Sequence, residues 1–162
     1  MRITWAFAAL TLTVIALGLQ RIALLMALLL ASAACSTPYQ PDGWTGGYKD
    51  ERLGPNTWRV SFQGNPNRDA TFVMNAAMYR AAEIAKREGH GYFQVTLAST
   101  VVTHRAYVNF TNLVSHKAEL TMSGVPTFAA GCPQGRALGC QVYATDDALA
   151  RYGRSIGVSP KR

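Results

Sequence analysis

The sequence predicts an α+β domain, built from a mainly antiparallel sheet with one long helix packed on a face of the sheet. Several segments alternate polar and apolar residues with the period of two that indicates strands. Residues 70–88 contain no Gly or Pro and have helical periodicity. Strands follow one another with few helices between them, which is typical of α+β proteins. The predicted order is β-β-α-β-β-β-α, after an N-terminal apolar leader helix.

Residues 1–34 have the composition of a leader. Within them, residues 22–34, IALLMALLLASAA, form an apolar run that is too short to span a bilayer, which takes about 20 residues. A charge, an apolar core and small residues before a cut are the parts of a secretory signal. The arrangement resembles a bacterial lipoprotein signal, in which the thiol of Cys35 carries the lipid and several acyl chains hold the protein stably on a membrane.

Two points about the leader stay open. Ser32 stands where lipoprotein signals usually have an aliphatic residue, so the alternative is an ordinary signal peptide cut near Ala34, with Cys35 as a free thiol. Residues 3–19 form a second apolar run, which is interpreted either as a true membrane helix or as sequence upstream of a later translation start. Ser36, rather than Asp, follows Cys35, and in the lipoproteins that this signal resembles this favours the outer membrane.

Charge restricts the classes of partner. Without Arg2 and Arg21 of the leader, the chain keeps 14 basic and 9 acidic residues, a net charge of +5. A positive envelope protein can meet anionic lipid head groups or cell-wall acids, although a solvated surface with a mild basic bias is the plainer interpretation. Export by a leader argues against a nucleic-acid partner.

Residues 35–47 are expected to be the lipid anchor and a flexible linker, because 36–47 are rich in Pro, Gly, Ser and Thr. The aromatic rings of Tyr39 and Trp44 would either enter the head-group layer or fold back on the domain. A single envelope domain is expected over 48–162. It would begin with a hairpin of two strands, 48–53 and 57–63, joined by a Gly-Pro-Asn turn.

The predicted helix over 70–88 has recognisable ends, with Asp69 as its N-cap and Gly89 just beyond its last turn. Glu83 and Arg87 are spaced to form an i, i+4 ion pair. The apolar stripe that should face the sheet comprises Ala70, Val73, Met74, Ala77, Met78, Ala81, Ile84 and Ala85.

Phe72 and Tyr79 fall opposite this stripe, on the side of the helix that should face solvent. Two aromatic residues are unusual there, so either a partner or another segment of the chain is expected to cover them. They are the candidate interaction surface.

After the helix, the period of two continues through residues 91–102, 105–115 and 117–122. Residues 140–144 resemble a final strand. A short helix would follow, with Thr145 as its cap and Gly153 at its end.

Three cysteines are present, and lipidation of Cys35 would leave Cys132 and Cys140. An even remainder in an oxidising compartment predicts a disulfide between them. Two unpaired thiols are the alternative. No C-x-x-C or H-x-x-x-H spacing accompanies these cysteines, so we expect no metal site.

A family resemblance covers about residues 35–100. It rests on Gly47, Tyr48 and Leu53 in a G-Y-x-x-x-x-L hairpin, on Val60, Phe62, Gly64 and Asn65 in a V-x-F-x-G-N strand end, and on residues 80–83 in an R-A-A-E helix. These motifs resemble a family of small, uncharacterised bacterial lipoproteins. The resemblance implies a lipid anchor and an α+β envelope domain, and it implies no catalytic residue.

The sequence contains no G-x-S-x-G elbow, phosphate-binding loop, dinucleotide-binding turn or H-E-x-x-H motif. We therefore expect a chain that is not an enzyme and needs no cofactor. The leading hypothesis is a membrane-tethered structural or protein-interaction module that faces the periplasm and meets an envelope protein. The alternative is a periplasmic ligand-binding module for a small or anionic envelope component.

Overall fold

The computed structural model describes residues 20–21, 36–107, 110–132 and 139–158. The chain forms two compact units, Met1–Cys35 and Ser36–Arg162. Gln20 and Arg21 are helical, whereas the rest of the predicted leader helix and Cys35 lie outside the described residues. Every described residue of the hydrophobic core belongs to the second unit.

The second unit is α+β, as the sequence predicts, with a five-stranded antiparallel sheet and two α-helices. The strand order across the sheet is β1-β2-β4-β3-β5, and each neighbouring pair is antiparallel. The strands are β1 (Gly47–Gly54), β2 (Thr57–Gln63), β3 (Tyr92–Tyr107), β4 (Phe110–Val125) and β5 (Gln141–Ala144), and the helices are α2 (Ala70–Arg87), α3 (Thr145–Ile156) and the short 3₁₀ helix η1 (Phe128–Ala130).

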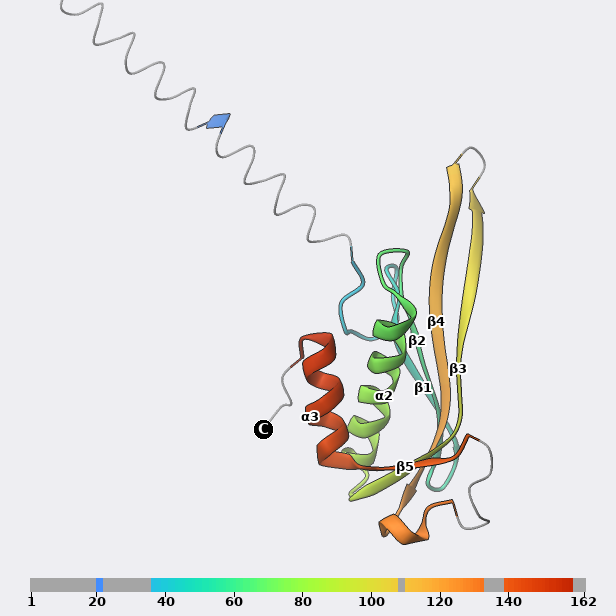
Figure 1. Ribbon diagram of the computed structural model, residues 1–162, viewed down its shortest axis with the longest axis vertical. Helices are drawn as coiled ribbons and strands as arrows, with labels where there is room; N and C mark the ends of the chain where they lie inside the picture. The colour runs from blue at the N-terminus through green and yellow to red at the C-terminus, as the bar shows by residue number, and fades with distance from the viewer. Residues whose placement is uncertain (1–19, 22–35, 108–109, 133–138, 159–162) are drawn as a thin grey trace, which may run out of the picture. The chain divides into compact units, whose positions relative to one another are not determined.

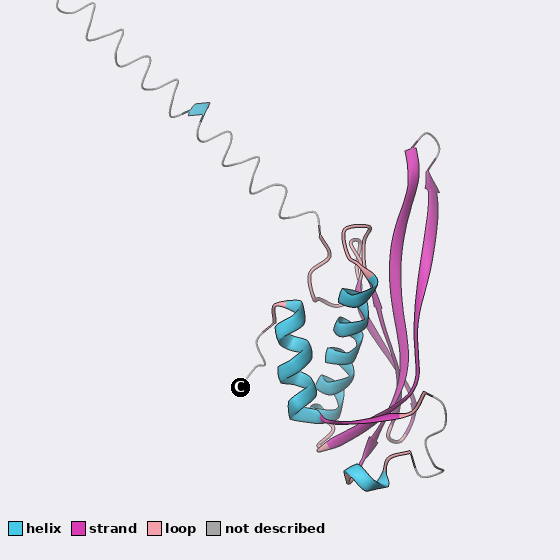
Figure 2. Cartoon of the chain, in the orientation of Figure 1, coloured by secondary structure: helices cyan, strands magenta, loops and turns pink. Residues whose placement is uncertain are grey.

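Both α-helices lie on the same face of the sheet (Figures 1 and 2). Register explains which side chains reach them, because alternate residues of a strand point to opposite faces. Val60 pairs with Leu120 and Phe62 pairs with Ala118, and all four are buried beneath the helices. The residues between them, such as Arg59 and Ser61, therefore point to the other face.

Helix α2 begins after Asp69, whose side chain accepts a hydrogen bond of 2.6 Å from the Phe72 N–H. It ends before Gly89, which has a φ of +79° that favours glycine. The side that meets the sheet is rich in alanine, and Ala77, Ala81 and Ala85 are fully buried. Such small side chains let the helix backbone approach the sheet closely.

The two longest strands correct the predicted boundaries. The segments expected at 105–115 and 117–122 belong mostly to one strand, β4, and β3 continues through His104 without a break. No Gly or Pro interrupts either strand between 92 and 123, and alternation alone does not locate a turn. Because β2 pairs with β4 only from Lys117 to Ser123, the far part of the β3–β4 hairpin projects beyond the rest of the sheet (Figure 1).

Two expectations for α3 are wrong. Thr145 is the first helical residue and not the cap, because its hydroxyl is buried and donates to the His90 carbonyl at 2.7 Å. Gly153 does not end the helix, which continues to Ile156 and stops at Gly157 with a φ of +72°. Gly153 is instead buried, and a Cβ there would lie 3.0 Å from the Tyr79 ring.

The segment expected to be a flexible linker is part of the folded domain. Thr37 is fully buried; its hydroxyl donates to the Thr45 carbonyl and accepts from the Asn65 N–H at 2.9 Å. Arg68 donates to the Thr37 carbonyl at 2.7 Å. Gly46, with a φ of +94°, lies so near the Gln63 carbonyl that a Cβ would be 2.2 Å from that oxygen. Composition indicated a linker because it does not register these tertiary contacts.

Cys132 and Cys140 are joined by a disulfide, with their Cα atoms 6.0 Å apart. Residues 133–138 lie outside the described part of the chain. The Cys132 N–H donates to the Gln94 side chain at 2.6 Å, which holds one end of the bridge against β3. Cys140 directly precedes β5, and Cys132 lies just after η1. The bridge therefore links the start of β5 to the end of η1.

Replacement of Ala81 by Asp should lower the free energy of unfolding by several kcal/mol, because it places an unpaired charge in the core. Urea unfolding followed by circular dichroism would measure the loss. Thr71→Asp is the matched control: Thr71 is exposed in the first turn of α2, where a carboxylate is favourable. Equal stability of the two variants would contradict this account of the α2–sheet contact.

Mass spectrometry after alkylation with and without reductant should detect the Cys132–Cys140 bridge in the folded protein. For so short a loop, the chain-entropy model assigns the bridge roughly 2.5 kcal/mol. The double variant Cys132→Ser, Cys140→Ser should therefore unfold at a lower urea concentration. Two thiols that are alkylated without reductant would refute the bridge.

Candidate functional site

In the described part of the chain, one face of the sheet carries no helix and leaves polar side chains open to solvent. Its side chains come from β1, β2 and β4, which lie side by side. Arg59 of β2 lies 3.1 Å from Glu51 of β1 and 3.6 Å from Glu119 of β4, and Lys117 lies 3.2 Å from Glu119. These side chains are 40–58% exposed, so their ion pairs add little to stability. We call this surface the uncovered face.

A groove of about 590 Å³ opens where the uncovered face meets the end of the sheet nearest Thr37. That volume is within the range of small-molecule sites. Two loops, 42–47 and 64–66, form its rim, and its remaining lining comes from the strands: Lys49, Ser61, Gln63, Ser115 and Lys117. Trp44 on the rim is fully exposed. The groove thus combines two ammonium groups, hydroxyls, two amides and an aromatic ring with one carboxylate, Asp42.

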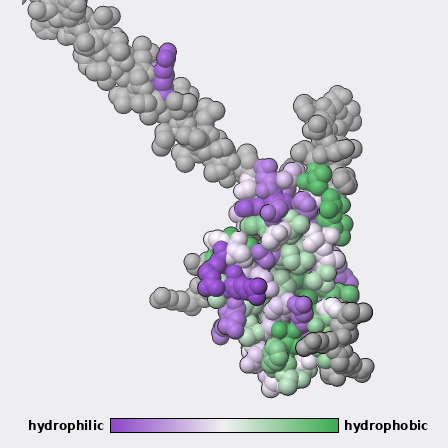
Figure 3. Space-filling model, in the orientation of Figure 1, coloured by the Kyte–Doolittle hydropathy of each residue, from purple (hydrophilic) through white to green (hydrophobic). Residues whose placement is uncertain are grey.

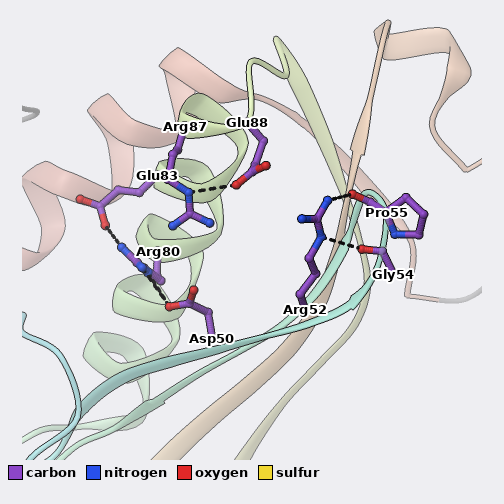
Figure 4. A network of polar contacts seen from close by, with 8 residues as sticks. All are labelled: Asp50, Arg52, Gly54, Pro55, Arg80, Glu83, Arg87 and Glu88. Carbon is purple, nitrogen blue, oxygen red and sulfur yellow. Dashed lines mark hydrogen bonds and ion pairs between the residues drawn. The ribbon is translucent and has the colours of Figure 1, made fainter.

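On the helical side, a partly buried polar cluster fastens the N-terminal segment to the domain. Arg80 of α2 donates to Asp50 of β1 at 2.9 Å and to Glu83 at 3.1 Å, as Figure 4 shows. The Tyr39 hydroxyl donates to the same Glu83 oxygen at 2.5 Å. The Arg80 guanidinium also lies 4.2 Å from the centre of the Tyr48 ring. We call these five residues the N-terminal clasp.

Tyr39 is the residue of the clasp whose ionisation the fold changes most. Burial raises the pKa of its hydroxyl well above the ordinary value of 10, and the hydrogen bond to Glu83 and the negative charge of that carboxylate raise this pKa further. Tyr39 therefore remains a neutral donor to Glu83 over the physiological range. The clasp has the properties of a structural contact: its groups are paired with one another.

The ion pair expected between Glu83 and Arg87 is absent. Glu83 points to Arg80, and Arg87 lies 3.0 Å from Glu88 (Figure 4). The i, i+3 partner prevails because Arg80 is already held by Asp50, so Glu83 completes an existing cluster.

Phe72 and Tyr79 do not form the exposed surface that the helical pattern predicts. Tyr79 is 2% exposed; the Tyr39 ring lies 5.0 Å away at right angles, and α3 covers its other side through Gly153. Phe72 is partly buried between the Phe62 ring, at 5.8 Å, and the Arg68 guanidinium, at 3.8 Å. Of the two alternatives, cover by other segments of the chain is the one that the fold adopts.

The described residues contain no group of three or more His, Cys, Asp and Glu side chains that could hold a metal ion. His116 is engaged through Nδ1 with the Arg68 carbonyl at 3.0 Å, and the His90 ring packs near Trp58. Among the helices in the described part of the chain, none has the length and apolar character needed to cross a membrane.

Sequence reasoning missed both the groove and the clasp. The groove unites residues from three separate stretches of the chain, 42–49, 61–66 and 115–117, and nothing in the spacing of Lys49 and Lys117 links them. One signal in the sequence pointed to the clasp: an aromatic residue in a polar segment is expected either to fold back on the domain or to meet lipid. Tyr39 folds back, whereas Trp44 stays in solvent.

Comparisons with protein-family models, with curated proteins and with solved structures found no match. The resemblance to small bacterial lipoproteins therefore stays a prediction.

Because of the clasp, the free energy of unfolding should decrease at alkaline pH. Because folding raises the pKa of Tyr39, the unfolded chain releases this proton above about pH 10 while the folded chain keeps it, and stability falls as the pH rises. Tyr39→Phe should lose about 1.5 kcal/mol near neutral pH, the value of a hydrogen bond to a charged group, and should lose less stability than wild type between pH 9 and 11. Urea unfolding across this range measures both effects. Parallel curves for the two proteins would contradict this role of Tyr39.

Proposed function

We propose that the chain is a lipid-anchored protein of the cell envelope, whose domain binds an envelope partner and catalyses no reaction. Acylation of Cys35 would supply the anchor, and the domain would face the periplasm, in the outer membrane by the nature of Ser36. The proposal joins the lipoprotein-like leader to a domain in which the described residues include no assembled set of catalytic groups that we can identify.

The observation that carries the proposal is how close to Cys35 the described domain already has a buried residue. Thr37 is fully buried, and only Ser36 separates it from Cys35. Successive Cα atoms are 3.8 Å apart, so an acylated Cys35 would hold the fold within about 8 Å of its anchor point. This is far shorter than a flexible linker of 12 residues would allow, and it supports a domain that acts at the membrane surface.

The uncovered face is the surface that we assign to the envelope partner. Its charges of both signs, Arg59 and Lys117 beside Glu51 and Glu119, are exposed and contribute little to the fold. Such a pattern can be matched by complementary charges on a protein partner, which gives specificity and faster association.

The groove favours a second candidate function, the binding of a small anionic component of the envelope. Lys49 has no ion pair with any described residue, and Lys117 shares Glu119 with Arg59. The Lys49 ammonium is therefore available to an anion, Lys117 could join it by exchanging its ion pair with Glu119, and the exposed Trp44 ring offers a flat apolar surface in the same groove.

Cys35→Ser should release the domain from the membrane fraction or leave the leader uncut, and it should abolish incorporation of labelled palmitate. Ser36→Ala, the neighbouring control, keeps the thiol and should retain both properties.

To locate the partner, a photocrosslinker at Thr121 on the uncovered face should capture an envelope protein, whereas one at Arg151 on α3 should not. Unchanged processing, labelling and fractionation of Cys35→Ser would refute the anchor, and equal capture from the two positions would refute the assigned face.

A further inference from the structure

The two edges of the sheet differ in how they are protected. Exposed strand edges offer unpaired N–H and C=O groups to other strands, and proteins usually block them with charges, Pro or covering segments. Along β1, the Tyr48 N–H donates to the Gln40 carbonyl at 2.8 Å and the Asp42 N–H donates to the Tyr48 carbonyl at 2.9 Å. Four charged residues, 49–52, follow in the same strand. This edge is both covered and charged.

The opposite edge, along β3, lacks these protections. Strand β5 pairs with β3 only from Tyr92 to Val95, and no other described strand lies on that side. Residues 96–103, TLASTVVT, contain no charge, Pro or Gly. Two irregularities interrupt the pairing of β3 with β4: one between Val95 and Leu97, where the free edge begins, and one between Arg105 and Tyr107, at its far end.

Apolar side chains accompany the free edge. Leu97 is 70% exposed, Val101 52% and Val102 47%. Leu97 and Val101 are on the uncovered face, and Val102 is on the opposite face, so a strand added at this edge would cover apolar groups on both sides. Figure 3 shows hydrophobic surface along the hairpin next to its grey tip. In a strand pair, the Cβ atoms of directly opposite residues are about 4.5–5.5 Å apart, so their side chains touch. A paired strand would therefore bury these exposed apolar side chains.

We propose that this edge pairs with the same edge of a second copy of the chain, so that two five-stranded sheets become one continuous antiparallel sheet. An isologous contact of this kind requires a surface that is complementary to itself. The run 96–103 meets that requirement because it carries no charge that could face a like charge. The inference does not depend on acylation of Cys35.

The geometry also selects a register. Strand β5 blocks β3 up to Val95, and β3 ends at Tyr107, so the free edge extends from Leu97 to Tyr107. Two such edges pair over their whole length only when Leu97 lies opposite the other copy's Tyr107. Val102 then lies on the two-fold axis, opposite itself.

The test uses residues 36–162, the second compact unit, which contains all the core residues that the structure describes. Analytical ultracentrifugation should show a dimer that dissociates on dilution. Val102→Lys would place two ammonium groups opposite each other on the axis and should weaken dimerisation by about tenfold or more. Leu53→Lys is the matched control, since Leu53 is 45% exposed on β1 and is as accessible as Val102. It should dimerise like wild type. Circular dichroism melts would establish that both variants are folded.

The register has its own test. Oxidation of Val102→Cys should give a disulfide-linked dimer, whereas Leu97→Cys, whose two copies would be far from each other, should remain unlinked. A wild-type domain that stays monomeric at every concentration would overturn the proposal. So would a domain whose free edge pairs with a strand of another protein and never with a second copy. So would a Val102→Lys variant that dimerises as well as Leu53→Lys, or cross-linking at position 97 in preference to 102.

Discussion

The contact between α2 and one face of the sheet is the interaction on which the rest of the structure depends. The helix has alanines where it lies closest to the sheet, and the strands contribute larger buried side chains such as Phe62, Leu120 and Met122. Large residues on one layer and small residues on the other allow the close packing that is typical of protein interiors. Because a two-layer domain has one helical layer, this packing also leaves the second face of the sheet without cover.

The N-terminal segment and α3 complete the burial that α2 begins. An isolated helix on a sheet would expose the sides of α2, and Tyr79 lies on one of them. Tyr39 and Gly153 close over that ring from two different parts of the chain. Within the N-terminal clasp, the charge of Arg80 is then paired with those of Asp50 and Glu83 at the margin of this contact. The result is a domain in which Thr37, two residues after Cys35, is already fully buried.

The proposed functions follow from what this arrangement leaves open. Burial of hydrophobic side chains concentrates on the helical face, so the uncovered face, the groove and the β3 edge are the parts of the described domain that remain available for binding. Each has different chemistry: mixed charges on the face, two lysines and a tryptophan at the groove, and uncharged backbone and aliphatic groups along the edge. Three surfaces of different chemistry on one small domain are compatible with binding at a membrane and with self-association.

The sequence by itself determined what depends on local pattern. Alternation in 57–63 established which side chains of β2 face the core, and Asp69 and Gly89 mark the ends of α2 because capping is a local interaction. Only the tertiary structure decided the rest. Composition assigned 36–47 to a linker and the helical period placed Tyr79 in solvent, and both are wrong because the covering residues are distant in the chain. The groove and the clasp were equally hidden, since their residues meet only after β1, β2, α2 and β4 have packed together.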